Sequence, residues 1–219
     1  MEFLMEILLN AVILVVVLAV ISFLIIHHKK RRTNRIAEIA IDLKLAFSCR
    51  ENPDCKDSIF ESMSFGIFKD GSVEDMIYGE VGNAEFAIFD HGYAASYGSG
   101  QYNSAHHQTV IYFKSANLQL PRFTLSPDDL YHKTSSAYDF PTHLDFSGKY
   151  LLRGKDAVEI RALFTDKLLD FFCSLQEINV EGGGDQLIVY RDNKRLRPEK
   201  WKSFMDEGVQ IFGEFLGAD

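Results

Sequence analysis

The N-terminal part of the chain contains a long apolar run, and this run limits where everything downstream can lie. From Ile7 to Ile26 no residue is charged, and only Asn10 and Ser22 are polar. Twenty residues of α-helix span about 30 Å, which is the hydrocarbon thickness of a bilayer. The sequence therefore predicts a transmembrane helix at residues 4–26, with the lipid bilayer as its partner.

Two alternatives to a retained anchor are a cleaved secretory signal and a buried core helix. A signal peptide has a basic start, a shorter apolar core and small residues at its cleavage site, whereas this chain starts with Glu2 and Glu6 and continues into bulky basic residues. A core helix usually keeps a polar stripe, and this run is apolar on all sides. We therefore predict a retained anchor, residues 1–26.

A basic collar, residues 27–35, follows the apolar run and predicts the orientation. Its positive charges are Lys29, Lys30, Arg31, Arg32 and Arg35. Because such flanks stay in the cytoplasm, we expect a single-pass inner (plasma) membrane protein with its N-terminus outside and its downstream domain cytoplasmic. The collar can also attract anionic headgroups, although its role in topology explains it without a specific lipid site.

Residues 36–219 are long enough for one domain with its own core, and we expect this fragment to fold without the anchor. The whole chain has a formal net charge of −8; setting aside two N-terminal glutamates and five collar cations leaves −11 for this domain. So acidic a domain is a poor match for nucleic acid. Three cysteines without a C-x-x-C pair indicate a reducing compartment and no disulfide framework.

The apolar patterns after the collar predict an α+β domain, with an antiparallel sheet and flanking helices. Ile36, Ile39, Leu43 and Phe47 recur at helical spacing and predict a helix to about residue 48, in one rod with the anchor. Runs rich in Val, Ile, Phe, Tyr and Thr, separated by turn signals, are typical of antiparallel strands. These runs are residues 62–68, 75–81, 85–98, 106–115, 120–126, 149–154, 178–181 and 186–190.

Three further helices are expected. Ser126 is placed to cap a short helix, with Pro127 at its first position. Asp156 and Glu159 resemble a capping box and begin a second helix, which extends to Phe172. The last helix begins at a proline, and its apolar face contains Trp201, Phe204, Met205, Val209, Phe212 and Leu216.

Several segments resemble a family of uncharacterised bacterial membrane-anchored proteins. They are TVIYF and LQLPRFTLSP, then DF and FSGKYLLRG, then VEGGGDQLIVYR followed by a helix that opens with proline. The likeness covers the chain from Gly79 to the C-terminus and includes the N-terminal anchor. It implies a shared fold and a shared membrane address, and it transfers no catalytic residue.

A cluster of histidines is the main candidate for metal or enzyme chemistry. The residues are His91, His106, His107, His132 and His143, with Asp90, Asp139 and Asp145 nearby. They lack the H-x-x-x-H and H-E-x-x-H spacings that place two ligands on one helix face, so we predict neither a metal nor a cofactor. If three or more of these histidines and Asp139 met in one cleft, an enzyme would be favoured.

Other catalytic signals are absent from the sequence. The glycine-rich stretches 98–100 and 182–185 lack the lysine of a phosphate-binding loop and are typical of turns. The chain contains no G-x-S-x-G elbow that would expose a nucleophilic serine. We therefore predict no catalytic residue.

The predicted binding surface lies on a hairpin formed by residues 86–97 and 106–114. If Tyr97 faces His106, strand alternation gathers aromatic and histidine side chains on one face. This face would contain Phe89, His91, Tyr93, Tyr97, His106, Val110 and Tyr112. We expect its Tyr/His end to be an exposed recognition surface that changes charge between about pH 5 and 7; the alternative is that both faces are packed, with the histidines at the rim.

Arg153 lies between an apolar strand and a helix start. There it can hold an anion at the helix N-terminus or pair with Asp145 or Asp156. The candidate binding residues are therefore His91, Tyr93, Tyr97, His106 and Arg153. We expect a non-enzymatic interaction or sensing module at the inner membrane face, with a protein partner; the alternative is a membrane-tethered enzyme, hydrolytic or metal-dependent, that uses the region from His91 to Asp145.

Overall fold

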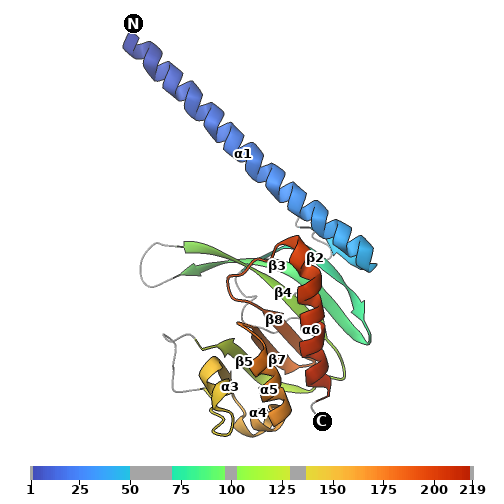
Figure 1. Ribbon diagram of the computed structural model, residues 1–219. Coiled ribbons are helices and arrows are strands. Elements are labelled where there is room, and N and C mark those ends of the chain that lie inside the picture. The colour runs from blue at the N-terminus through green and yellow to red at the C-terminus, as the bar shows by residue number, and fades with distance from the viewer. Residues whose placement is uncertain (1, 50–70, 97–102, 129–136, 218–219) are drawn as a thin grey trace.

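The computed structural model describes residues 2–49, 71–96, 103–128 and 137–217. A long N-terminal helix leads into a domain in which helices cover one face of a sheet (Figure 1). The predicted fold class, α+β with an antiparallel sheet, flanking helices and one apolar N-terminal helix, is confirmed. The predicted strand at residues 62–68 lies outside the described residues.

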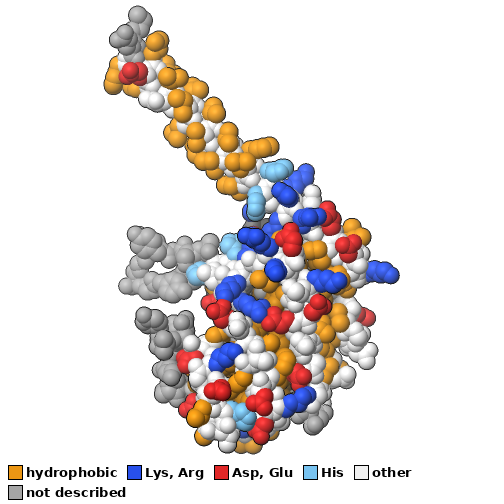
Figure 2. Space-filling view, in the orientation of Figure 1, with side chains coloured by type: hydrophobic (Ala, Val, Ile, Leu, Met, Phe, Trp, Pro, Cys, Tyr) orange, Lys and Arg blue, Asp and Glu red, His pale blue; other side chains and the backbone are white. Residues whose placement is uncertain are grey.

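Helix α1 runs without a break from Glu2 to Leu43, through both the apolar run and the basic collar. Its 42 residues give a length of about 63 Å. Among the described residues it is the one helix long and apolar enough to cross a membrane. No part of its most apolar stretch is buried against the domain. Figure 2 shows it as an apolar rod projecting from a charged domain. The predicted continuous rod is confirmed.

The helix ends earlier than predicted, because Lys44 adopts a left-handed backbone conformation with φ of 57°. Phe47, which we expected on the helix, instead lies in β1 (Ala46–Ser48). This short strand pairs antiparallel with β2 at the edge of the sheet. Ile36 and Ala40, on the last turns of α1, are buried against the sheet.

Within the described residues the sheet has eight strands, and all neighbouring pairs are antiparallel. The spatial order is β1-β2-β3-β4-β8-β7-β5-β6, so the last two strands of the chain insert between β4 and β5. The remaining strands are β2 (Ser72–Val81), β3 (Ala84–Ser96), β4 (Asn103–Lys114), β5 (Leu120–Pro127), β6 (Tyr150–Gly154), β7 (Asn179–Gly184) and β8 (Gln186–Tyr190).

The short helix predicted to begin at Ser126 is wrong for its first two residues. Ser126 and Pro127 continue β5, where they lie opposite Leu151 and Tyr150 of β6. Pairing with β6 therefore overrides the local helix-start signal. Proline is tolerated here because it is the last residue of the strand.

The other helices pack on one face of the sheet (Figure 1). They are α3 (Leu144–Lys149), α4 (Ala157–Leu163), α5 (Asp166–Ser174) and α6 (Trp201–Leu216), the last preceded by the 3-10 turn η3 (Pro198–Lys200). Asp156 caps α4 as predicted, accepting hydrogen bonds from the backbone N–H groups of Val158 and Glu159. The single helix predicted to reach Phe172 is interrupted at Thr165, whose extended backbone separates α4 from α5.

Helix α6 supplies much of the core, and its buried face differs from the predicted one. Trp201 is fully buried, as expected, but Val209 is 39% exposed. Gly208 faces the sheet instead, and a Cβ atom there would lie 2.6 Å from Ile111 Cδ1. The missing side chain therefore lets the helix approach the sheet at this turn. The buried face is Trp201, Phe204, Met205, Gly208, Ile211, Phe212 and Phe215.

Candidate functional site

The predicted binding hairpin is present, with a different register. In β3 and β4, Tyr93 lies opposite His106, whereas the prediction placed Tyr97 there. The difference is four residues, an even number, so alternation still places His91, Tyr93 and His106 on one face. Tyr97 itself lies outside the described residues.

The rings of His91, Tyr93 and His106 form a stack on this face. Ring centroids are 5.6 Å apart for the first pair and 5.3 Å apart for the second, with interplanar angles of 21°. His91 is buried, and the other two rings are half-buried. Burial, together with a smaller effect of His107, lowers the pKa of His91 to about 4. The predicted change of charge between about pH 5 and 7 is therefore wrong for His91.

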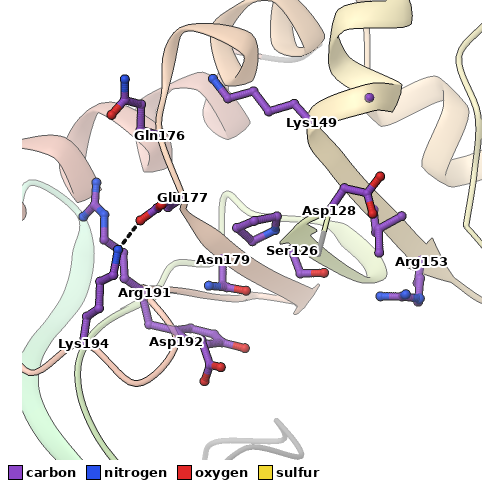
Figure 3. Close-up of a pocket in the computed structure, with 14 residues that line it drawn as sticks. Ser126, Asp128, Lys149, Arg153, Gln176, Glu177, Asn179, Arg191, Asp192 and Lys194 are labelled. Carbon is purple, nitrogen blue, oxygen red and sulfur yellow. Dashed lines mark hydrogen bonds and ion pairs between the residues drawn. The ribbon is translucent and has the colours of Figure 1, made fainter. Parts of the chain in front are cut away.

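A cleft of about 1130 Å³ opens on the same side of the sheet, along β5, β6, β7 and β8 (Figure 3). Figure 3 shows charged side chains around its rim, with Lys194 donating a hydrogen bond to Glu177. Arg191 is also paired, over 2.7 Å, with Glu207 of α6. The charged residues of the lining are Lys149, Arg153, Arg191, Lys194, Asp128, Glu177 and Asp192.

One hydrogen bond connects the ring stack to this cleft. The hydroxyl of Tyr93 donates to Asp192 Oδ1 over 2.9 Å, and Asp192 belongs to the cleft lining. Arg153, the fourth described candidate, lines the same cleft. The structure therefore brings His91, Tyr93, His106 and Arg153 to one side of the sheet, although their predicted binding role stays a prediction.

The other candidates for metal or enzyme chemistry lie elsewhere. His143 precedes α3, with its Nε2 atom 3.8 Å and 3.7 Å from carboxylates of Asp166 and Asp170. Asp139 is exposed, and its carbonyl oxygen accepts a hydrogen bond from Arg161. His132 lies outside the described residues. Within the described ranges, no group of three His, Cys, Asp or Glu side chains is arranged to hold a metal ion.

A second site, which the sequence did not indicate, lies where α1 meets the sheet. Asp90 in β3 is fully buried, and its Oδ2 atom accepts hydrogen bonds from two guanidinium groups. The donors are Nε and Nη2 of Arg32, at 2.9 Å and 2.6 Å, and Nε of Arg195, at 2.8 Å. The hydroxyl of Thr109 donates to Oδ1 over 2.8 Å. Together with Glu74, which accepts from Arg195 over 2.5 Å, these residues form the Asp90 cluster.

A β-bulge brings a second carboxylate of β2 beside this cluster. The pairing of β2 with β3 shifts by one residue after Val73. The extra residue allows the consecutive side chains of Glu74 and Asp75 to meet partners at the same junction. Asp75 accepts a hydrogen bond from the Thr33 hydroxyl of α1 over 2.9 Å. Burial raises the pKa of Asp75, and the Thr33 hydrogen bond opposes this effect.

The basic collar divides into two groups. The side chain of Arg32 is 12% exposed and also donates to the Leu196 carbonyl over 2.7 Å. Arg35 makes a surface ion pair with Glu38. On the face shown in Figure 2, basic side chains lie at the neck between the apolar rod and the domain. The other collar cations, Lys29, Lys30 and Arg31, are exposed.

A smaller cleft, which we call the neck cleft, opens beside the Asp90 cluster and has a volume of about 540 Å³. Its helix side begins at Ile26, the last residue of the apolar run, and continues through Lys29 and Lys30. Its domain side contains Glu74, Asp75 and Arg195. The cleft therefore has an apolar end at Ile26, a cationic rim at Lys29 and Lys30, and an inner end, called its acidic floor below, where the carboxyl groups of Glu74 and Asp75 lie beside Arg32 and Arg195.

Sequence reasoning missed this junction because its members come from distant segments. Asp90 lies 58 residues from Arg32 and 105 from Arg195 in the chain. The one available signal was a charged residue, Asp90, within an otherwise apolar strand pattern, since a buried charge needs a partner. That signal indicates that Asp90 has a charged or hydrogen-bonding partner, but it does not identify which residue the partner is.

The chain matches no protein-family model and no curated protein. Among solved structures it is similar to the crystal structure of the mycobacterial trehalose monomycolate transport factor A, TtfA. The TM-score is 0.58 at 11% sequence identity, and the match covers 85% of this chain and 93% of that chain. At this identity the likeness shows a common fold.

Proposed function

We propose that the protein is a single-pass inner (plasma) membrane protein whose α+β domain is a non-enzymatic interaction module at the cytoplasmic face. The observation that carries this proposal is the continuity of α1, which is unbroken from the apolar run into the Asp90 cluster. A helix that is both membrane span and part of the domain packing would hold the domain at a fixed orientation to the bilayer. Such placement suits a surface that must meet a partner at the membrane.

The proposed orientation rests on the distribution of charge. The cations of the collar follow the apolar run, and only Glu2 and Glu6 are charged before it. Cationic flanks remain in the cytoplasm during insertion. The similar solved structure is that of a transport factor, and a role in transport accords with a module that binds without chemistry of its own.

The proposed partner surface is the face that contains the ring stack and the cleft of Figure 3. Its mixed lining suits a charged segment of a protein partner, because a guanidinium such as that of Arg153 can hold a carboxylate through two parallel hydrogen bonds. Tyr93 adds an amphipathic ring at the edge of the same surface. The alternative of an enzyme would require three or more of the candidate side chains in one cleft, and His143, beside α3, and Asp139, which contacts Arg161 of α4, lie on elements other than the β3–β4 hairpin that contains His91 and His106.

Topology is tested with two reporters fused after Asp219. A reporter enzyme that works only outside the cytoplasm should be inactive, and one that works only inside it should be active. The opposite pattern would contradict the orientation. Extraction of cell membranes at alkaline pH provides a separate check, since a spanning protein stays in the membrane pellet.

The partner surface is tested by crosslinking in intact cells, followed by identification of the crosslinked protein. Arg153→Ala should reduce the yield of that crosslink about tenfold, as expected for loss of a strong contact. Tyr93→Phe, which removes only the hydroxyl that contacts Asp192, should reduce it less. Lys155→Ala is the matched control, because Lys155 is exposed, close in sequence and outside the cleft lining. Equal yields from Arg153→Ala and Lys155→Ala would contradict the proposed surface.

A further inference from the structure

The charges of the neck cleft are ordered along the axis of α1. Ile26 closes the apolar run, and Lys29 lies three residues further along the helix, a rise of about 5 Å. If residues 4–26 fill the hydrocarbon layer, as the proposed function requires, the cleft therefore opens at the level of the lipid headgroups. Ile26, whose side chain is exposed, gives the cleft an apolar end on the side of the apolar run.

The inner end of the cleft contains two carboxyl groups, those of Glu74 and Asp75, together with Arg32 and Arg195. Both arginines donate to the buried carboxylate of Asp90 behind the cleft, and Arg195 also donates to Glu74. Asp75 is 6% exposed, and its described hydrogen bond comes from a neutral hydroxyl. A carboxylate that is removed from water in this way gains from a small cation that donates hydrogen bonds to it.

The rim of the cleft has the opposite character. Lys29 and Lys30 are exposed, and among the residues that the structure describes neither makes an ion pair. Their ammonium groups are therefore available to a phosphate at the level of the headgroups. The cleft thus presents positive charge toward the membrane and negative charge at its inner end.

We propose that the neck cleft binds an aminophospholipid headgroup, with its primary ammonium beside Glu74 and Asp75 and its phosphate between Lys29 and Lys30. A headgroup of this class carries both charges in the order that the cleft presents. A quaternary ammonium cannot donate hydrogen bonds to the carboxylates, and an anionic glycerol headgroup has no cation for the floor. The cleft should therefore select phosphatidylethanolamine over phosphatidylcholine and phosphatidylglycerol.

The test is a lipid titration of the full-length protein in detergent micelles, read by native mass spectrometry as the fraction of protein with one lipid bound. Phosphatidylethanolamine should bind at least about tenfold more tightly than phosphatidylcholine or phosphatidylglycerol. The reason is that a hydrogen bond to a charged group contributes about 1.5–3 kcal/mol, and about 1.4 kcal/mol corresponds to a tenfold change in affinity. Soluble phosphoethanolamine, which lacks acyl chains, forms a separate arm. If it binds as tightly as the lipid, the assignment to a membrane lipid is overturned.

Variants of residues that line the neck cleft test whether the lipid preference arises there. Asp75→Asn should remove the preference for phosphatidylethanolamine over phosphatidylcholine, whereas Asp42→Asn, at an exposed position near the end of α1, should keep it. If Asp75→Asn fails to fold, the double change Lys29→Gln and Lys30→Gln is used, because it alters only exposed side chains. It should weaken the binding of phosphatidylethanolamine about tenfold and leave the thermal unfolding transition of the protein unchanged. Equal affinity for the three lipids, or a preference unaltered by these variants, would overturn the proposal.

The titration is independent of the tests of cellular topology and partner capture. A protein that failed membrane extraction would contradict the proposed function without altering affinities measured in micelles. A correctly inserted protein without lipid preference would contradict this inference alone.

Discussion

Arg32 and Asp90 are joined by two hydrogen bonds from one guanidinium group to a single carboxylate oxygen, across 58 residues of sequence. Because Asp90 is fully buried, its charge depends on compensation by Arg32 and Arg195. The pair therefore couples the collar part of α1 to β3. Removing one partner should affect both the stability of the domain and its attachment to the helix.

Arg32→Ala should lower the free energy of unfolding by about 3 kcal/mol, because it leaves a buried carboxylate with one guanidinium partner fewer. The measurement is denaturant unfolding of the full chain in mild detergent, followed by the fluorescence of Trp201, which is the single tryptophan. Arg35→Ala is the control, since Arg35 is also a collar cation but pairs with Glu38 on the surface. A loss no larger than that of the control would show that the buried pair contributes little.

Trp201→Ala should be among the most destabilising single changes in α6. The side chain is fully buried in the core, so its removal leaves a cavity and should cost about 3–5 kcal/mol. Val209→Ala on the same helix should cost under about 1 kcal/mol, because Val209 is exposed. Unfolding is followed by circular dichroism, since the first variant lacks the fluorophore. Similar costs for the two changes would contradict the orientation of α6.

The structural features that were predictable from the sequence and those that were not differ in the range of the forces that determine them. The apolar run, the continuous α1 and the cap at Asp156 depend on neighbours within a few residues, and each was predictable. Phe47 and Ser126 fit a local helix pattern, yet strand pairing with β2 and β6 determines their structure. Pairing energy comes from distant segments that a local pattern does not contain.

The candidate site follows the same division. Alternation placed His91, Tyr93 and His106 on one face even though the assumed register was wrong, because an even shift preserves the face. The pattern could not predict how deeply each ring is buried, and burial is what lowers the pKa of His91. The Asp90 cluster was missed entirely, since it requires a bulge in β2 and an arginine 105 residues after Asp90.

The stability of the domain should decrease below neutral pH because of His91. Its pKa is about 4 in the folded protein and about 6.5 when exposed, so the unfolded chain binds more protons between these values. The neutral ring therefore makes its full contribution to the free energy of unfolding above about pH 6.5. This contribution is lost as the pH falls toward 4, and the loss is on the order of 1–3 kcal/mol. Unfolding free energies of the natural chain and His91→Gln at several pH values measure the difference. An equal pH dependence for both would exclude His91 as the source.

The fragment 36–219 should fold, but it should be less stable than a fragment that begins at Lys29. The shorter fragment loses the hydrogen bonds of Arg32 to Asp90 and of Thr33 to Asp75, and hydrogen bonds to charged groups contribute about 1.5–3 kcal/mol each. We therefore expect the longer fragment to unfold at clearly higher denaturant concentration.

Arg32→Ala within the longer fragment separates the two explanations for such a difference. If the Asp90 cluster is responsible, this change should reproduce most of the loss, because Lys29, Lys30 and Arg31 are exposed and contribute little packing. If added helix length alone stabilised the fragment, the variant would remain as stable as its parent. That result would place the domain boundary at residue 36, as the sequence pattern predicts, and would remove the collar from the domain.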